Sequence, residues 1–285
     1  MRVSIITPFY HGNQYLPQLF KSINKACSNF DGVELILIND DPDDPIVYDR
    51  SKKFNFVIRE FSNNTNKGIH ATRIYGISEA VGEYILFLDQ DDTISPNSIK
   101  TQFATITKTN ADIVLGNGYF ETSSKDSRLI YDNYFSQKFA AKERPYIMAR
   151  DFIVSPGQCI IRKRSIPQTW LLKPINSNGA DDYLLWLLLF NLNAHFEINP
   201  LPVYTHVYTG NNYSLNPAKM LSSQLDVLKW LKHNSSYPKS KLQKLEKQID
   251  FKANYKAHPI KYAFKHPIIT IYNIYYRTIW RGYTC

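Results

Sequence analysis

The sequence predicts an α/β protein with a mixed, mainly parallel sheet flanked by helices and with a helical extension at its C-terminus. Three observations support this prediction: strand and helix patterns alternate through residues 1–118, Tyr84–Leu88 is a continuous apolar run, and polar residues gather where strands end. Strands buried on both faces read as continuous apolar runs, and alternation at this spacing is typical of parallel sheets. The 285 residues, of which 44% are hydrophobic, suffice for one large domain or one and a half.

The first half of the chain supplies strands and helices in turn. Strands are expected at 3–7, 33–39, 55–61, 83–88 and 111–117, and helices at 14–26, 69–81 and 95–108. The first helix has Leu16, Leu19, Phe20 and Ile23 at the spacing of an amphipathic helix. From 119 to 150 the pattern weakens into polar, aromatic and basic residues, so we predict a surface excursion there, a mobile loop over the site.

Regular structure is predicted again in the second half. Order returns at 152–162, the Leu-, Trp- and Phe-rich stretch 181–192 reads as a buried helix, and 195–208 reads as a strand. Helices at 218–233 and 240–255 precede a basic, aromatic end. We therefore expect a domain at 1–215, with halves at 1–118 and 119–215, and a helical extension at 216–285.

The most informative segment contains Asp89, Asp91 and Asp92 directly after an apolar strand. Clustered carboxylates repel one another unless a cation neutralises them, and hard oxygen ligands suit Mg²⁺ or Mn²⁺, which bridge protein carboxylates to phosphates. The alternative is a helix start that Asp92 or Ser95 caps. Capping explains one acid and not three, so we favour a metal–phosphate site, which open α/β sheets place at the carboxyl ends of strands.

Two further strand ends contain candidate binding residues. After the first strand comes Thr7-Pro8-Phe9-Tyr10, whose aromatic rings could pack beside a nucleoside. After the second, Asp40 could accept a hydrogen bond from the N3–H of uracil or from a ribose hydroxyl. The Asp- and Pro-rich sequence that follows is also a strong turn signal, and the residues alone leave these two readings of Asp40 open.

Two helix starts complete the set of candidate residues. Gly68 permits a tight approach at the first, and Arg73, five residues later, could donate to a base or phosphate or could face solvent on an amphipathic helix. At the second, Asp181 and Asp182 open the Leu- and Trp-rich helix. One acid would suffice as a cap that the helix dipole stabilises, so a second acid directed into a cleft could act as a general base.

Three widely separated cysteines argue against a disulfide framework and favour a reducing compartment: Cys27, Cys159 and Cys285. No Cys/His cluster has the spacing of a zinc site, and the N-terminus begins with strand-like residues rather than with a signal peptide. No apolar run reaches the roughly 18 residues that span a bilayer. We therefore expect a cytoplasmic protein.

The excess positive charge lies in the C-terminal part. Residues 219–285 contain 13 Lys and Arg against three acids, a net of +10, whereas residues 1–218 sum to −1. Aromatic residues are interleaved with the basic ones: Tyr255, Tyr262, Phe264, Tyr272, Tyr275, Tyr276, Trp280 and Tyr283. Such a tail can lie on an anionic membrane surface, pack on the domain or between copies, or bind nucleic acid. We favour peripheral contact with the inner face of the cytoplasmic membrane and expect no nucleic-acid partner.

Taken together, these segments resemble the family 2 glycosyltransferases, which have the GT-A fold, a Rossmann-like arrangement. The resemblance covers residues 3–118 closely and continues to about 215. Each motif is degenerate, but their order and spacing in one chain are specific. They are Ser4–Tyr10, Leu37–Asp40, Asn66-Lys67-Gly68 with Ala71 and Arg73, Gly82–Asp92, and Asp181-Asp182.

The resemblance implies a donor site for a nucleotide sugar. Asp40 and Arg73 would hold the base, usually uracil, in a pocket lined by Thr7, Phe9 and Asn66. A departure from the family is the loop after the second strand, where this chain has an Asp-Pro pair in place of Gly-Ser or similar residues.

The resemblance also implies a metal and a base. Asp89 would contact the ribose, and Asp91, with Asp89 and His206, would bind Mn²⁺ or Mg²⁺ at the pyrophosphate. Asp182 would be the catalytic base that deprotonates the acceptor hydroxyl. Asp181 replaces the Glu that usually precedes it and would contact substrate, as would Gly157 on the acceptor side: the acceptor-half candidates are Gly157, Asp181 and Asp182.

The activity implied is that of an inverting, metal-dependent glycosyltransferase. It would move a hexosyl or N-acetylhexosaminyl group from a nucleotide sugar, with UDP favoured, to a hydroxyl of a glycan or of a polyprenyl-linked glycan in the assembly of a bacterial surface polysaccharide such as capsule. Two alternatives remain: a nucleotidyltransferase, which would have a Gly-rich basic loop after the first strand, and a non-catalytic module that binds nucleotide sugar or glycan.

Overall fold

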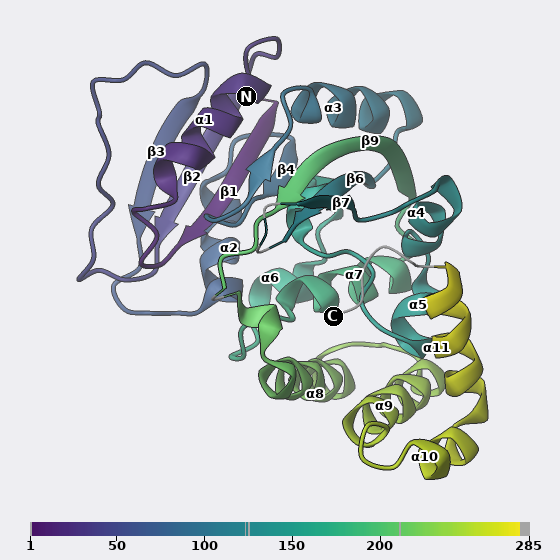
Figure 1. Ribbon diagram of the computed structural model, residues 1–285. Helices are drawn as coiled ribbons and strands as arrows, with labels where there is room; N and C mark the ends of the chain where they lie inside the picture. Colours follow the sequence, from purple (N-terminus) through teal and green to yellow (C-terminus); the bar gives the residue numbers. More distant parts are fainter. Residues whose placement is uncertain (1, 123, 125, 211, 280–285) are drawn as a thin grey trace.

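The structure of the protein, a computed structural model, describes residues 2–122, 124, 126–210 and 212–279 (Figure 1). Its strands are β1 (Val3–Phe9), β2 (Val33–Asn39), β3 (Val57–Ser62), β4 (Tyr84–Phe87), β5 (Thr93–Ile94), β6 (Ile113–Glu121), β7 (Ser127–Leu129), β8 (Cys159–Arg162) and β9 (Phe196–His206). They form one sheet in the order β3-β2-β1-β4-β8-β6-β9-β5, with β7 paired to β6.

The sheet is mixed, as the sequence predicts. The first four strands of that order are parallel to one another, and β9 is parallel to β6. The short strand β8 is antiparallel to both β4 and β6 and joins the two parallel groups. The carboxyl ends of β1, β2 and β4 therefore meet at one edge, where the polar residues of the sequence gather.

Helices cover the sheet and extend below it (Figure 1). They are α1 (Leu16–Ala26), α2 (Ile69–Glu79), α3 (Ser98–Thr109), α4 (Tyr134–Ala140), α5 (Glu143–Met148), α6 (Gln168–Leu172), α7 (Asp181–Asn191), α8 (Pro217–Asn234), α9 (Lys239–Asn254), α10 (Pro259–Lys265) and α11 (Pro267–Ile279). Side chains of the C-terminal helices, such as Leu231 and Leu245, belong to the same core as the sheet residues. The division into 1–215 and 216–285 stays a prediction.

The close packing of α2 on β1 determines where the side chains of α2 lie relative to the strand ends. A Cβ at Gly76 would lie 2.4 Å from Cγ2 of Ile6, which is fully buried in β1. Only a glycine allows the helix backbone to approach the strand this closely. Arg73, almost one turn earlier on the same helix, is consequently buried beneath the strand ends.

The prediction of a mobile surface loop at 119–150 is wrong. β6 continues to Glu121 and forms a hairpin with β7, after which α4 and α5 follow. Tyr131 and Tyr146 are almost fully buried, and the Asn117 side chain donates to the Tyr131 carbonyl (2.9 Å) and accepts from its amide (3.1 Å). The segment gains its order by burying aromatic rings against residues distant in sequence, a contribution that local patterns do not reveal.

Two expectations fall partly outside the described residues. Cys27 and Cys159 are buried free thiols, which agrees with the absence of a disulfide framework, whereas Cys285 is not described. Trp280 and Tyr283 of the aromatic tail also lie outside the described residues. Within the described residues, no helix has the length and apolar character required to cross a membrane.

Candidate active site

Asp40, at the end of β2, orders the loop that leads into α2. One carboxylate oxygen accepts hydrogen bonds from the Asn63 side chain and the Lys67 amide (both 2.8 Å), and the other accepts from the Gly68 amide (2.9 Å). Gly68 has a φ of +80°, a conformation that favours glycine. Both oxygens of Asp40 thus accept hydrogen bonds from the loop, and Asp40 holds that loop in place. Its contact with a base stays a prediction.

The other residues expected around the base differ in exposure. Thr7 and Phe9 have no exposed surface, so in this structure they support the wall of the site from behind and do not line it. Asn66 is exposed on the loop, where its side chain accepts from the Gly68 amide (3.1 Å). Alternation along β1 directs Thr7 and Phe9 to the same face, and that face is core.

Arg73 joins two segments of the site that are far apart in sequence. Its Nη2 donates to Asp89 Oδ1, and its Nη1 donates to Asp181 Oδ2, each at 2.6 Å. The guanidinium lies over the Phe87 ring, 5.6 Å from its centroid, and Arg73 is only 2% exposed. Arg73 thus bridges the end of β4 and the start of α7. Its expected contact with the nucleotide stays a prediction.

The charges in this bridge stabilise one another. Burial alone would lower the pKa of Arg73, but the Asp181 and Asp89 carboxylates beside it raise it, so the guanidinium stays charged. Burial raises the pKa of Asp89, and Arg73 opposes that rise. Two carboxylates and one arginine therefore form a unit whose members depend on one another.

Asp182 is the acid beside this bridge that remains partly exposed. It lies in the first turn of α7, where Oδ1 accepts from the Tyr183 amide (2.7 Å). Burial and the charge of Asp181 raise the pKa of Asp182 to about 7, although Arg73 opposes the rise. A carboxylate that titrates near neutral pH is suited to take a proton from a substrate hydroxyl.

The charge of Asp182 acts on a second acid, Asp151, which sequence reasoning missed. Burial, followed by the charge of Asp182, raises the pKa of Asp151 well above its usual range. Its Oδ1 accepts from the Ile153 amide (2.9 Å). Asp151 directly follows the segment 119–150, which the sequence predicts to be a mobile loop. An acid next to a predicted loop gives no reason to expect a site residue.

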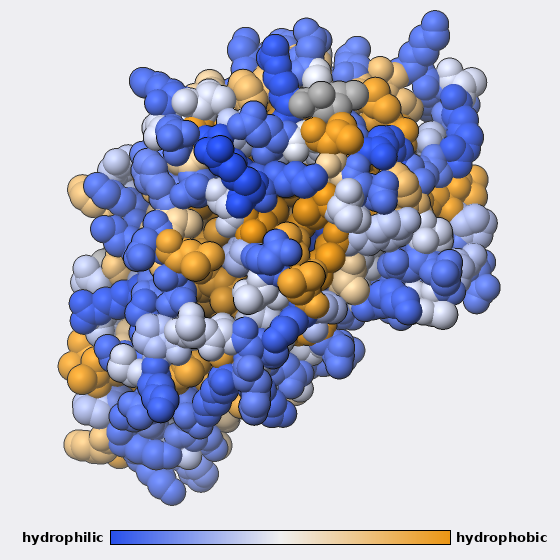
Figure 2. Space-filling model, turned by 180° about the vertical axis from the view of Figure 1, so that it is seen from behind, coloured by the Kyte–Doolittle hydropathy of each residue, from blue (hydrophilic) through white to orange (hydrophobic). Residues whose placement is uncertain are grey.

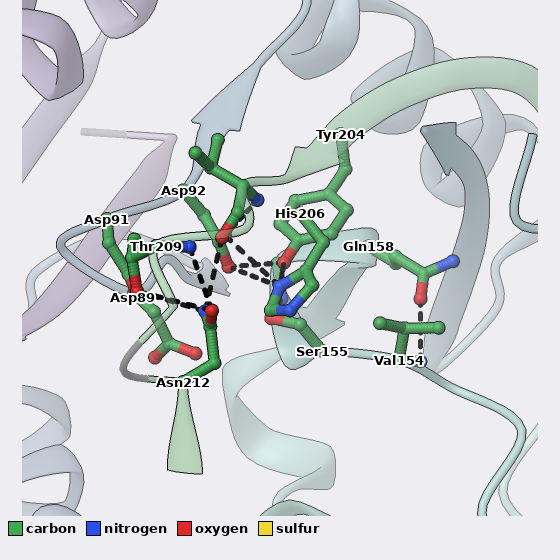
Figure 3. Close-up of polar contacts among 12 residues, drawn as sticks. Asp89, Asp91, Asp92, Val154, Ser155, Gln158, Tyr204, His206, Thr209 and Asn212 are labelled. Carbon is green, nitrogen blue, oxygen red and sulfur yellow. Dashed lines mark hydrogen bonds and ion pairs between the residues drawn. The ribbon is translucent and has the colours of Figure 1, made fainter. Parts of the chain in front are cut away.

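Asp92 anchors the exit of β9 (Figure 3). It is 1% exposed and accepts hydrogen bonds from the Tyr204 hydroxyl and the Val207 amide, the latter at 2.9 Å. The alternative of a helix cap is wrong, because α3 begins at Ser98 and no side chain caps it. Tyr204 was not predicted as a site residue. The alternation of side chains along a strand shows that a tyrosine is buried, but not that its hydroxyl donates to a site carboxylate.

His206 lies against Asp92 and not against Asp91. Its Nδ1 is 3.2 Å from Asp92 Oδ1, and its ring lies 5.2 Å from that of Phe120. Burial alone would lower the pKa of His206, but the charge of Asp92 and its hydrogen bond raise it above the ordinary value. The expected role of His206 as a metal ligand stays a prediction.

Asp91 lies under the segment that follows β9 (Figure 3). The Asn212 side chain donates to Asp91 Oδ2 (3.4 Å) and to the Val207 carbonyl (3.1 Å), and it accepts from the Thr209 amide (2.9 Å). A cavity of about 270 Å³ beside Asp91 is bounded by this segment and by Tyr15, which directly precedes α1. No sequence signal distinguished Asn212 from the other asparagines of its loop.

The acids after β4 fit a hard divalent cation. Burial, then the charges of Asp92 and Asp89, raise the pKa of Asp91 to about 7, which indicates repulsion that a cation would relieve. Among the described residues, no three His, Cys, Asp or Glu side chains form a complete metal cage. Mg²⁺ and similar ions usually take one or two carboxylates and complete their shell with water and phosphate oxygens, and Asp89 and Asp91 suit that arrangement.

Gly157, which is expected near the acceptor, is buried against Tyr204. A Cβ there would lie 2.5 Å from the Tyr204 ring and 3.4 Å from the Leu88 side chain. Close packing of Tyr204 accounts for the glycine. A direct contact between Gly157 and an acceptor stays a prediction.

A buried tryptophan holds the start of α7 in place. The Trp170 indole N–H donates to the Asp181 carbonyl (2.9 Å), and its ring lies 4.1 Å from that of His70 on α2. His70 Nδ1 accepts from the Ile175 amide (3.0 Å), so Nε2 bears the proton and faces the Trp170 carbonyl (3.2 Å). Burial lowers the pKa of His70 to about 4, which keeps the ring neutral.

Replacing Trp170 by Phe is expected to lower the free energy of unfolding by about 1–3 kcal/mol, because the buried Asp181 carbonyl loses its donor. Sugar transfer should fall by about tenfold or more with a smaller change in nucleotide affinity, since Asp182 shares that helix turn. Urea denaturation, calorimetry and turnover measure these effects. Trp230→Phe is the matched control: its indole donates to the Lys173 carbonyl (2.8 Å), away from these acids, so stability alone should change.

Comparison with known proteins identifies the family. The family model described as "Glycosyl transferase family 2" matches residues 4–170. Glycosyltransferase GlyG of Streptococcus pneumoniae serotype 4 is 28% identical over 143 residues, which are 50% of this chain and 46% of GlyG. Poly(ribitol-phosphate) beta-N-acetylglucosaminyltransferase TarS of Staphylococcus aureus is 28% identical over 206 residues, 71% of this chain and 34% of TarS. The chain thus spans less than half of these curated relatives.

Solved structures show the same fold. S. aureus TarS 1-349 in complex with UDP-GlcNAc has a TM-score of 0.64 at 18% identity, covering 95% of this chain and 79% of that one. The mannosyltransferase PcManGT from Pyrobaculum calidifontis, in complex with GDP-Man and Mn²⁺, has a TM-score of 0.59 at 9% identity, covering 97% and 75%. With its mixed sheet, its acids after β4 and its family match over more than half its length, the chain belongs to the family 2 glycosyltransferases and has the GT-A fold.

Proposed function

We propose that this glycosyltransferase is an inverting, metal-dependent enzyme that moves a hexosyl or N-acetylhexosaminyl group from a UDP-sugar to a hydroxyl of a glycan. The observation that supports this proposal most strongly is the Arg73 bridge, which holds the acid after β4 beside the start of α7. Asp182, next to Asp181 on α7, then lies close to the place where a diphosphate would bind. A structural relative in complex with UDP-GlcNAc supports the choice of donor.

In this mechanism the donor diphosphate lies at Asp89 and Asp91. A divalent cation held there would neutralise the leaving nucleoside diphosphate. Asp182 accepts the proton of the acceptor hydroxyl while that oxygen attacks the anomeric carbon. The bond from this carbon to the diphosphate oxygen breaks on the opposite face, so the anomeric configuration inverts. Arg73 donates to Asp181 and holds it in place, and so positions the helix turn that contains the base.

The setting we propose is the assembly of a bacterial surface polysaccharide. Relatives include TarS and the minor teichoic acid biosynthesis protein GgaB of Bacillus subtilis, which is 34% identical over 101 residues, 34% of this chain and 11% of GgaB. An acceptor carried on a polyprenyl lipid would bring the enzyme to the inner face of the cytoplasmic membrane.

Nucleotide binding tests the donor site. Calorimetry with UDP, GDP and dTDP, each with Mn²⁺ or with EDTA, is expected to give tight binding for UDP with Mn²⁺ and weak binding with EDTA. Equal affinity with and without metal would contradict the proposed metal site. Tight binding of the UDP-sugar with no transfer to any glycan and no hydrolysis would favour the non-catalytic binding module.

The pH dependence of transfer follows from the pKa of Asp182. Because the base acts deprotonated and its pKa is about 7, kcat is expected to fall by about tenfold per pH unit below that value. The pKa of Asp91 is also raised to about 7, but a cation held by Asp89 and Asp91 would displace that proton. The profile is therefore measured between about pH 5.5 and 9 with saturating donor and Mn²⁺. A kcat that stays constant down to pH 5.5 would contradict the assignment of Asp182 as base.

A further inference from the structure

The last helix, α11, has apolar side chains on two opposite faces. On its inner face Ile269 and Tyr276 are each 4% exposed, and the Tyr276 ring lies 4.6 Å from Phe139 and 5.3 Å from Phe152. The opposite face exposes isoleucines at helical spacing: Ile268, Ile271 and Ile274, at 62%, 66% and 58%. Apolar side chains exposed at helical spacing, opposite the face that packs on the core, are typical of a face that a partner covers.

The neighbouring helix extends the same kind of surface. Ile260 and Phe264, one turn apart on α10, are 74% and 83% exposed. Figure 2 shows hydrophobic residues exposed at the lower left, the side to which the half-turn brings α10 and α11. Exposed apolar residues gathered in this way mark interaction sites, whereas single ones need no explanation. We call the five side chains of α10 and α11 the outer face: Ile260, Phe264, Ile268, Ile271 and Ile274.

The charges next to the outer face are of one sign. After Asp250 the sequence contains no acid, and its charged residues are Lys252, Lys256, Lys261, Lys265, Arg277 and Arg281. Lys265 is paired with Asp250 (2.7 Å), whereas Lys256, just before α10, and Lys261, on α10, are exposed. Exposed lysines that flank apolar side chains complement the headgroups of an anionic bilayer.

We propose that the outer face docks on an anionic lipid bilayer, with its apolar side chains at the acyl boundary and with Lys256 and Lys261 among the headgroups. A second copy of the chain is a poorer partner, because a symmetric contact through this face brings like charges together. The helices lie on the membrane in this arrangement, since no described helix is long enough to cross it. Only the link to a lipid-borne acceptor rests on the proposed function.

Vesicle flotation tests the docking directly. The full chain is expected to float with vesicles of phosphatidylcholine and phosphatidylglycerol, and much less with phosphatidylcholine alone. The triple variant Ile268→Glu/Ile271→Glu/Ile274→Glu should lose flotation, and Lys256→Ala/Lys261→Ala should weaken binding by roughly 25-fold, about fivefold for each lysine. Val81→Glu/Leu192→Glu is the matched control, because these residues are similarly exposed (63% and 61%) but lie on other elements.

Flotation of the triple variant as strong as that of the wild type would overturn the proposal. The proposal would also be overturned if the wild type did not float. In that case, a dimer that light scattering detects and that the triple variant abolishes would identify the outer face as a contact between copies. Calorimetry with UDP and Mn²⁺ on each variant separates this question from the proposed function. Retained nucleotide binding shows that a variant is folded, so its loss of flotation supports the docking surface.

Discussion

Replacing Asp182 by Asn is expected to lower sugar transfer by about 10²–10⁴-fold while nucleotide affinity stays within about twofold. Asn keeps the size of the side chain and an oxygen that can accept from the Tyr183 amide, so the first turn of α7 should persist. It cannot take a proton from the acceptor. Transfer is measured with saturating donor and acceptor, and affinity is measured by calorimetry with UDP and Mn²⁺.

Asp151→Asn is the control for this variant. Burial and the charge of Asp182 raise the pKa of Asp151 as well, but Asp151 follows α5 and does not belong to the helix turn that Arg73 holds; its Oδ1 accepts from the Ile153 amide (2.9 Å). Its replacement should reduce transfer far less than that of Asp182. An Asp182→Asn enzyme with near wild-type turnover, or an equal loss in both variants, would contradict the assignment of the base.

Replacing Arg73 by Met is expected to lower the free energy of unfolding by about 3–5 kcal/mol. The variant leaves Asp181, which is 1% exposed, beside Asp89 without the guanidinium that now donates to both. Uncompensated charge in a buried site is costly, and protonation of the acids relieves only part of it. Urea denaturation at pH 7.5 measures the loss.

Two further variants separate this bridge from arginine burial in general. Arg73→Met/Asp181→Asn should recover part of the stability, because it removes one of the two unpaired charges. Arg162→Met is the matched control: Arg162 is 5% exposed, but its partner Glu83 is 63% exposed in the side chain and water can solvate it. If the Arg73 variant lost no more stability than the Arg162 variant, the bridge would not have the role described here.

Much of this architecture was predictable because local and tertiary preferences agree. The mostly apolar segments 33–39 and 84–87 form β2 and β4, each of which has a neighbouring strand on both sides, so their burial agrees with their composition. The acids after β4 could be identified as candidate site residues because helix capping accounts for one acid at that position and not for three. The ion pair of Arg73 with Asp181 could not be predicted, because the two residues lie 108 positions apart and no local pattern encodes their pairing.

The remainder of the site depends on contacts between distant segments. Asp92, Tyr204 and Asn212 fix the exit of β9 through hydrogen bonds that join residues more than 110 positions apart. The segment 119–150 is ordered by aromatic packing that includes Tyr276 of α11, near the opposite end of the chain. Such packing becomes visible only when the elements are assembled.

The measurement that tests the central claim most directly is donor hydrolysis by wild type, Asp91→Ala and the control Asp226→Ala. UDP-, GDP- and dTDP-sugars are each incubated with Mn²⁺ or with EDTA, and the release of nucleoside diphosphate is followed. We predict slow release of UDP by the wild type and by Asp226→Ala with Mn²⁺, none with EDTA, and a large loss in Asp91→Ala. Release that is as fast with EDTA, or in Asp91→Ala, as in the wild type with Mn²⁺ would contradict a metal-dependent donor site at the acids after β4.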